Sequence, residues 1–415
     1  MRLDKISLKN YRCYEDIEIL FHPSFNILVG INGTGKTAML EAVRIAIGSL
    51  YCEFDKVENK ISSPSISEND VRLHNSEMQY EVHINSSIIV DPSLYKSSTI
   101  SWGRYVERYG GSTKYERPKF IKEFSKEIQR IIRAGENKTI PLIAYYSTDR
   151  YKKEKKNTGL EADGSRLRGY YNALDSLTNI WFFLNIYKTE TLWELQHGEK
   201  SPLLSAVNRA VQMCVYDCVN IYHDIKKDKL IIQLRNGEMI PFHMLSDGVR
   251  NVLAMVMEIA FRCHLLNPHL GEEASIKTNG VVLIDEIDLH LHPEWQKKIV
   301  NDFVKAFPSI QFIVTTHAPL VIGALKEGKI VSITDRKIHS FPIQYGKDAN
   351  TILNEMGTIE MDDEIKSKLN EYFLLIEEGK GRLDCGLMLR IQLEQILGKE
   401  HTEMQRADTM LNLFD

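Results

Sequence analysis

Eight residues near the N-terminus have the types and spacing of a phosphate-binding loop. They fit the pattern G-x-x-x-x-G-K-[ST] and read Gly30, Ile31, Asn32, Gly33, Thr34, Gly35, Lys36 and Thr37. In such a loop the glycines let backbone N–H groups face a phosphate, the lysine reaches the β/γ oxygens, and the final hydroxyl holds Mg²⁺. An apolar run before the loop and helix-forming residues after it predict a strand, a loop and a helix. We therefore expect ATP and Mg²⁺ to bind residues Asn32, Gly33, Thr34, Gly35, Lys36 and Thr37.

A second segment could supply the carboxylates that such chemistry needs. Residues 281–284 form an unbroken apolar run that ends in Asp285 and Glu286. A short run of this kind is typical of a strand buried on both faces of a parallel sheet, and ligands bind at the carboxyl end of such strands. We expect Asp285 to hold Mg²⁺ and Glu286 to polarise an attacking water. The alternative is a strand that ends in two solvated acids.

Two further segments could complete a nucleotide site. Ser246 and Gly248 stand at the start of an apolar-periodic helix, where a hydroxyl and free N–H groups can bind an anion. An ordinary helix cap is the alternative for this serine. Residues 310–316 predict another buried strand, which is followed by His317. A histidine in this position is often a loop residue without a catalytic role.

Taken in order, these motifs resemble the ABC-type ATPase heads of the structural-maintenance-of-chromosomes, double-strand-break-repair and RecF kind. The resemblance implies an α/β fold, an ABC-type P-loop NTPase head with a split core, an α+β insertion and a helical C-terminal extension. It also implies a dimer that sandwiches two ATP molecules. Within that dimer Ser246 and Gly248 would contact the nucleotide of the other subunit, Glu286 would be the catalytic base and His317 would sense the γ-phosphate. His292 stands where many such heads carry an aspartate for communication between the two sites.

Residues 141–150, 285–293 and the tail after Gln344 are similar to compact bacterial ATPases without a long coiled coil. The match is strongest with the PtuA ATPases of the Septu anti-phage system and their retron-associated relatives. This resemblance implies a homo-oligomer that regulates a separate effector, an HNH nuclease subunit of the PtuB-like kind. Alternatives are a RecF-like DNA repair ATPase, a transport ATPase, and an ATPase-nuclease of the overcoming-lysogenization-defect type.

The motifs divide the chain into four expected segments. Residues 1–50 and 229–345 would form the two parts of the ATPase head, and residues 51–228 an insertion of strands followed by helices. Residues 346–415 would form a helical segment for partner docking or oligomerisation, with apolar positions at Leu387, Leu389, Ile391, Leu393, Ile396 and Leu397. Packing of this segment back onto the head is the alternative.

Bulk composition limits the remaining functions. The 415 residues are 43% hydrophobic and 26% charged with a net charge of −4, which is typical of a globular cytoplasmic protein and gives no overall attraction to DNA. Only the run from Arg150 to Lys156 suggests a local DNA contact, and a solvated loop is the alternative. No apolar stretch is long enough to cross a membrane.

The sequence gives only weak support for a structural metal site or for a nuclease site. Cys214 and Cys218 are four residues apart on an expected helix, with His223 beyond, but a fourth metal ligand is missing and packing is the simpler reading. Glu378 and Asp384 only superficially echo the acids of a metal-dependent nuclease. We therefore expect no nuclease site in this chain.

Overall fold

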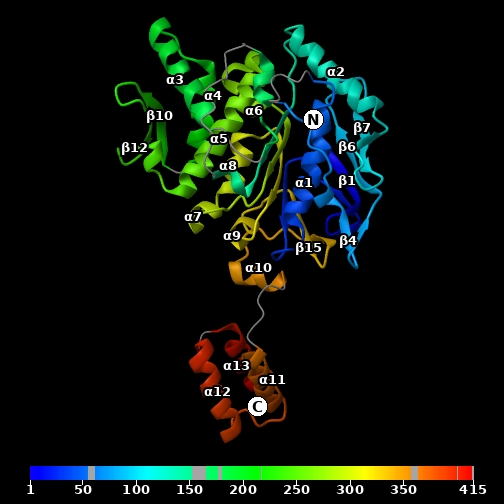
Figure 1. The fold of residues 1–415 in the computed structure, drawn as a ribbon. Helices are drawn as coiled ribbons and strands as arrows, with labels where there is room; N and C mark the ends of the chain where they lie inside the picture. Colours follow the sequence, from blue (N-terminus) through cyan, green and yellow to red (C-terminus); the bar gives the residue numbers. More distant parts are fainter. Residues whose placement is uncertain are drawn as a thin grey trace. The chain divides into compact units, whose positions relative to one another are not determined.

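The computed structural model describes residues 1–54, 61–151, 165–175, 180–215, 217–356, 363–399 and 401–413. The chain divides into two compact units, Met1–Ile352 and Leu353–Asp415 (Figure 1). Among the described residues, no helix is both long and apolar enough to cross a membrane.

A six-stranded sheet forms the centre of the first unit, in the order β16-β15-β3-β14-β13-β9. The strands are β3 (Phe25–Val29), β9 (Leu142–Tyr146), β13 (Gly280–Ile284), β14 (Ile310–Thr315), β15 (Lys329–Thr334) and β16 (Lys337–Phe341). All pairs are parallel except β15 with β16. Every residue of β3, β9, β13 and β14 is buried, which confirms the strands that the apolar runs predict at 25–29, 281–284 and 310–315. Their carboxyl ends therefore meet at one edge of the sheet.

Strand β9 lies within residues 51–228 and nevertheless belongs to the central sheet. Its residues pair in parallel register with β13, with Leu283 opposite Tyr145 and Ile284 opposite Tyr146. The backbone N–H of Asp285 continues this pairing by donating to the carbonyl of Tyr146 at 2.8 Å. The region between the two halves of the head thus supplies one strand directly beside the acidic strand end.

Two antiparallel sheets flank the central sheet. The first has the order β2-β1-β6-β7-β8, and the second the order β10-β11-β12. Figure 1 shows β1, β6 and β7 on the same side of this unit as α1 and α2, with α3, α4 and β10–β12 on the opposite side. The bounds are β1 (Arg2–Tyr11), β2 (Tyr14–Leu20), β6 (Val82–Ile89), β7 (Thr99–Val106), β8 (Lys114–Glu116), β10 (Cys218–Asp224), β11 (Lys229–Leu234) and β12 (Met239–Pro241). A separate hairpin joins β4 (Arg72–His74) to β5 (Glu77–Gln79).

The helices of the first unit cover these sheets. They are α1 (Lys36–Ile47), α2 (Lys119–Arg133), α3 (Ile180–His197), α4 (Pro202–Cys214), α5 (Asp247–Leu266), α6 (Ala274–Lys277), α7 (Pro293–Gln296), α8 (Ile299–Ala306) and α9 (Pro319–Ile322), and α10 (Ala349–Glu355) spans the division between the units. The expectation that Cys214 and Cys218 share a helix is wrong. Cys214 ends α4, whereas Cys218 begins β10 and pairs with Leu234 of β11.

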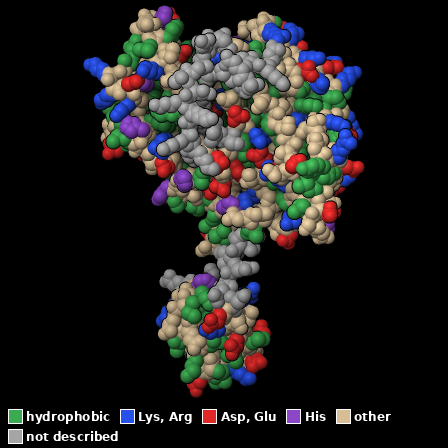
Figure 2. All heavy atoms as spheres, viewed as in Figure 1, with side chains coloured by type: hydrophobic (Ala, Val, Ile, Leu, Met, Phe, Trp, Pro, Cys, Tyr) green, Lys and Arg blue, Asp and Glu red, His purple; other side chains and the backbone are tan. Residues whose placement is uncertain are grey.

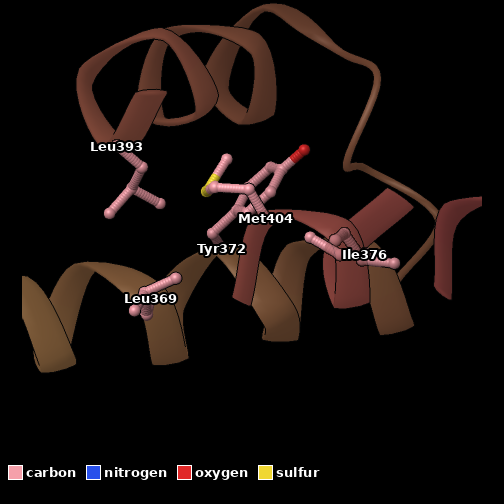
Figure 3. Packing of buried hydrophobic residues seen from close by; sticks show 6 residues of the cluster. Leu369, Tyr372, Ile376, Leu393 and Met404 are labelled. Carbon is pink, nitrogen blue, oxygen red and sulfur yellow. The ribbon is translucent and has the colours of Figure 1, made fainter. Parts of the chain in front are cut away.

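After the end of α10, the described residues of the second unit form α11 (Asp363–Glu377), α12 (Asp384–Leu397) and α13 (Thr402–Leu413). They enclose a core of their own, shown in Figure 3, formed by Leu369, Tyr372, Ile376, Leu393, Met404 and Ala407. The predicted apolar positions of α12 divide between two surfaces. Leu393 is fully buried and Leu389 and Leu397 pack against the core, whereas Leu387, Ile391 and Ile396 are exposed. Figure 2 shows hydrophobic side chains on the outer surface of this unit.

Candidate nucleotide-binding site

The predicted phosphate loop connects the buried strand β3 to α1 at the carboxyl edge of the central sheet. Gly33 and Gly35 take positive φ angles of 82° and 109°, which residues with a side chain rarely adopt. A Cβ at Gly35 would also lie 2.5 Å from the Cys13 sulfur and 2.7 Å from the Tyr14 hydroxyl oxygen. Asn32 and Gly33 are exposed, whereas Thr34 is buried and its hydroxyl donates to the carbonyl of Ile31 at 2.9 Å. The loop is therefore a fixed turn with an exposed rim.

Lys36 is buried beneath this turn, with 7% of its surface exposed. Its ammonium group donates to the carbonyl oxygens of Gly30 and Ile31, each at 2.9 Å. Burial lowers the pKa of Lys36, and the nearby carboxylates of Asp285 and Glu286 oppose that shift. A cation in this position favours an anionic ligand at the loop.

Thr37 and Asp285 bring the phosphate loop and the acidic strand end together. The Thr37 hydroxyl donates to Asp285 at 3.0 Å (Oδ2) and 3.3 Å (Oδ1). From the neighbouring strand, the Thr315 hydroxyl donates to Asp285 Oδ1 at 2.6 Å. Asp285 is almost fully buried, with 2% of its surface exposed. A hydroxyl and a carboxylate are oxygen ligands of the kind that Mg²⁺ prefers.

Glu286 follows Asp285 in a left-handed backbone conformation, with φ at 49°. Few non-glycine residues adopt this conformation, and those that do are often at functional sites. The backbone N–H of Glu286 donates to the Thr315 hydroxyl at 2.7 Å, and the N–H of Ile287 donates to the Thr315 carbonyl at 3.1 Å. Two bonds to β14 thus fix the turn that carries the candidate base.

The structure changes the interpretation of the predicted basic run. Arg150 is 5% exposed and donates to the backbone carbonyls of Asp285 at 2.7 Å and Glu286 at 2.9 Å. For Arg150, the expectation of a DNA-binding patch is wrong, because its guanidinium is buried and bonded to the backbone at the acidic strand end. Residues 152–156 of that run lie outside the described residues.

His317 is half-buried beyond the end of β14. Burial is the main cause that lowers its pKa, and the positive charge of Lys36 adds to it. The carboxylates of Asp288, Glu286 and Asp285 act in the opposite direction. His317 therefore shares one electrostatic environment with the lysine and the acids. The preceding residue, Thr316, donates from its hydroxyl to Asp288 Oδ1 at 2.5 Å.

Ser246 occupies the N-cap position of α5, yet its side chain makes no capping hydrogen bond. The serine is exposed, and among the described residues its hydroxyl makes no hydrogen bond to the phosphate loop of its own chain. Gly248 is buried, and a Cβ there would lie 2.3 Å from the carbonyl oxygen of His290. The start of α5 thus packs closely on the turn after β13 and leaves Ser246 facing outward.

Two contributions to the site have no counterpart in the sequence motifs. The Tyr145 hydroxyl donates to Glu41 at 2.8 Å, which ties β9 to α1 one turn after Thr37. Arg150 is the other, and only its place after the buried strand at 142–146 could have suggested that role. His292 caps α7, because its Nδ1 accepts from the N–H of Glu294 at 3.4 Å.

Residues 25–323 match the protein family described as "AAA domain, putative AbiEii toxin, Type IV TA system". The chain belongs to this family. The matched range begins with β3 and includes the phosphate loop, the start of α5, the acidic strand end and His317. The matched range therefore includes every motif named above at this edge of the sheet. The match assigns no role to individual residues.

Similar proteins extend the likeness over nearly the whole chain. The retron Vc95 probable ATPase of Vibrio cholerae serotype O1 biovar El Tor is 25% identical over 93% of this chain and 85% of that protein. The Septu protein PtuA of Bacillus thuringiensis is 24% identical over 89% of this chain and 86% of PtuA. The DNA replication and repair protein RecF of Lactococcus lactis subsp. cremoris (strain MG1363) is 54% identical, but over 10% of this chain and 12% of RecF. The predicted resemblance to retron and Septu ATPases is confirmed.

The fold has a counterpart among solved structures. An SmcHead bound to the C-winged helix domain of ScpA superposes with a TM-score of 0.50 at 15% identity, over 83% of this chain and 99% of that one. At this identity the likeness concerns the fold alone. The predicted ABC-type P-loop head is therefore confirmed as the fold class.

Proposed function

We propose that this chain binds ATP with Mg²⁺ at residues 30–37 and hydrolyses it. The main support for this function is the contact between Thr37 and Asp285. This contact joins two motifs that are far apart in the sequence at the carboxyl edge of the sheet. The buried Lys36 cation and the exposed loop rim suit an anionic ligand. When bound, ATP supplies the phosphoric anhydride bond that is broken.

Each residue of the site has a separate proposed role. Residues 32–36 hold the phosphate groups through backbone N–H groups and the Lys36 ammonium, and Thr37 and Asp285 hold Mg²⁺. Glu286 orients and deprotonates the attacking water, for which the fixed turn at this residue prepares it. We assign His317 to the γ-phosphate, because it follows the end of β14, which lies between β3 and β13 in the sheet.

The hydroxyl of Thr37 allows a matched test of this assignment. We expect Thr37→Ala to lower Mg²⁺-dependent phosphate release by about tenfold or more, whereas Thr37→Ser keeps the hydroxyl and most of the rate. The measurement is phosphate release from ATP with Mg²⁺ and with EDTA. Equal rates for the wild type and Thr37→Ala would contradict the metal-binding role.

The outward position of Ser246 supports an ATP-dependent dimer. A helix N-terminus with an exposed, uncapped hydroxyl can bind an anion that another molecule presents. We propose that Ser246 and Gly248 contact the nucleotide held by a second copy of the chain. Two equivalent nucleotides would then lie between two subunits related by a two-fold axis.

The retron and Septu relatives support a role in anti-phage defence as the ATPase subunit that regulates a separate effector. We propose that this effector is a nuclease subunit of the HNH kind, and that it docks on the exposed side of α12. Leu387, Met388 and Ile391 are 47%, 69% and 55% exposed there. RecF-like repair has less support, because the similarity to RecF sequences covers 10% to 18% of the chain.

In this division of labour, the chain itself does not cut DNA. Among the described residues, no group of three or more His, Cys, Asp or Glu could hold a metal ion. Asp384 lies in the first turn of α12, and Glu378 forms an exposed ion pair with Lys380 at 2.8 Å. The test incubates the purified chain with plasmid and Mg²⁺ or Mn²⁺, with and without ATP. Cutting that survives repurification and disappears in Glu378→Ala or Asp384→Ala would contradict the proposal.

A further inference from the structure

Arg150 joins three segments that the proposed reaction uses. It lies just past β9, in a 3-10 turn over Thr148–Tyr151, and its Nη1 donates to the carbonyls of Ser147 and Asp285 at 2.8 and 2.7 Å. Its Nη2 donates to the carbonyl of Glu286 at 2.9 Å. Its Nε donates to the side-chain oxygen of Asn251, on α5, at 3.2 Å. One buried guanidinium therefore contacts the residue after β9, the backbone of the acidic strand end and the helix that begins after Ser246.

We propose that Arg150 and Asn251 form a positioning pair, which holds Glu286 in place and couples it to the start of α5. The inference deepens the proposed ATPase function and rests on it for the role of Glu286. Arg150 holds Glu286 through the backbone carbonyls of Asp285 and Glu286, so it is a positioning residue and not a catalytic one.

The conformation of Glu286 explains why this position needs support. With φ at 49°, Glu286 holds a backbone conformation that the surrounding structure must maintain. Its N–H is fixed by the Thr315 hydroxyl at 2.7 Å and its carbonyl by Arg150 at 2.9 Å. Loss of the second bond would leave the residue held on one side only, and the direction of its side chain would then vary.

An arginine is required because the contacts diverge from one planar group. Three backbone carbonyls and one side-chain oxygen accept from Nε, Nη1 and Nη2. A lysine offers a single nitrogen at the end of a flexible chain and cannot reach all of these acceptors together. Because the position is buried, water cannot easily replace the lost donors.

Asn251 extends the link to the start of α5. It follows Gly248 by one helical turn and is 1% exposed. Its Nδ2 donates to the carbonyl of Leu289 at 3.3 Å, while its oxygen accepts from Arg150. The same amide therefore contacts the guanidinium and the turn after β13. A ligand that moves the N-terminus of α5 would shift this amide and, through Arg150, the backbone of Glu286.

The test compares Arg150→Lys with the matched control Arg166→Lys in the full chain. Arg166 also donates to three backbone carbonyls, those of Glu136, Lys138 and Leu266, but none belongs to the nucleotide site. Hydrogen–deuterium exchange of residues 285–291 without nucleotide is the first readout. The second pairs the affinity for Mg-ATP with the rate of phosphate release.

We expect Arg150→Lys to speed exchange across residues 285–291 and to lower the hydrolysis rate by about ten- to hundredfold, since small displacements of a catalytic group have effects of this size. The affinity for Mg-ATP should stay within about twofold, because the four acceptors of the Arg150 guanidinium named above lie outside the phosphate loop. Arg166→Lys should change neither the exchange in 285–291 nor the rate.

Variants of Asn251 provide a second test of the link between Arg150 and Glu286 if Arg150→Lys does not fold. Asn251→Asp keeps an acceptor for Arg150 but loses the donor to Leu289, whereas Asn251→Leu loses both. Exchange should therefore rise more in Asn251→Leu than in Asn251→Asp. Unchanged exchange in all these variants would overturn the proposal, as would faster exchange with an undiminished hydrolysis rate. If the wild type hydrolyses no ATP, the proposed function fails, and the exchange data alone decide whether Arg150 holds Glu286.

Discussion

The Thr37 hydroxyl lies 3.0 Å from Asp285 Oδ2, although 248 positions separate the two residues in the sequence. The parallel sheet creates this contact, because β3 and β13 flank β14 and end at the same edge. Thr315 of the intervening strand donates to the same carboxylate at 2.6 Å. The ends of three neighbouring strands thus bring the side-chain oxygens of Thr37, Asp285 and Thr315 together.

Lys36→Ala should abolish tight nucleotide binding. Its ammonium is the cation that the loop motif places at the phosphates, and a charge-assisted hydrogen bond contributes about 1.5–3 kcal/mol, or roughly ten- to hundredfold in affinity. Calorimetric titration with Mg-ATP measures the loss. Lys5→Ala, which removes an exposed partner of Glu18, is the control and should bind normally. Wild-type affinity in Lys36→Ala would disprove the phosphate-loop assignment.

Ser246→Arg should block ATP-dependent dimerisation while each chain still binds nucleotide. The serine is exposed and makes no capping bond, so the larger side chain should cost little stability and act only where a second copy approaches. Sedimentation with and without a non-hydrolysable ATP analogue measures the effect, with Ser65→Arg as an exposed control. If Ser246→Arg dimerises with ATP as tightly as the wild type, Ser246 makes no contact across the dimer and serves only to begin α5.

The two surfaces of α12 should respond differently to substitution. Leu387→Glu together with Ile391→Glu should abolish binding of the co-expressed nuclease subunit without loss of stability, because both side chains are exposed. Leu393→Ala should instead destabilise the second unit by about 2–5 kcal/mol, since Leu393 is fully buried in its core. Co-purification and thermal unfolding separate the two effects. Retained co-purification of the double variant would exclude this surface as the docking site.

The stability of the first unit should depend on pH through Asp302 of α8. Burial raises the pKa of Asp302 from 3.8 to about 6, while Lys305 and Lys298 oppose the shift. The carboxyl group ionises at lower pH in the unfolded chain than in the folded one. Its contribution to stability is therefore complete below about pH 3.8 and is lost as the pH rises through 6.

Asp302→Asn should consequently raise the free energy of unfolding at pH 8 by about 1–2 kcal/mol, which allows for the partial exposure of the site. The gain should be smaller at pH 5.5, where the folded wild type is largely protonated. Urea unfolding at the two pH values measures the difference, with the exposed Asp16→Asn as the control. An equal gain at both pH values would show that ionisation of Asp302 is not the cause.

The parts of the site that the sequence predicts are those with short-range signals. The glycine spacing and the apolar runs determine the phosphate loop, β13 and β14 through local sterics and burial. The local sequence around Arg150 is misleading, because a cluster of charges suggests a solvated loop. Only the long-range register between β9 and β13 places Arg150 in the interior. Similarly, helical spacing marks α12 as amphipathic, but which apolar residues reach the core depends on contacts with α11 and α13.

Phosphate release by Glu286→Gln measures whether Glu286 is the base that activates water for ATP hydrolysis. Gln keeps the size of the side chain and, with it, the backbone contacts to Thr315 and Arg150, but it cannot accept a proton from water. Hydrolysis should fall by about 10²-fold or more, with unchanged affinity for Mg-ATP and an ATP-bound dimer that persists. Glu294→Gln, on the exposed start of α7, should hydrolyse ATP normally. Hydrolysis by Glu286→Gln at the wild-type rate would show that Glu286 is not the catalytic base.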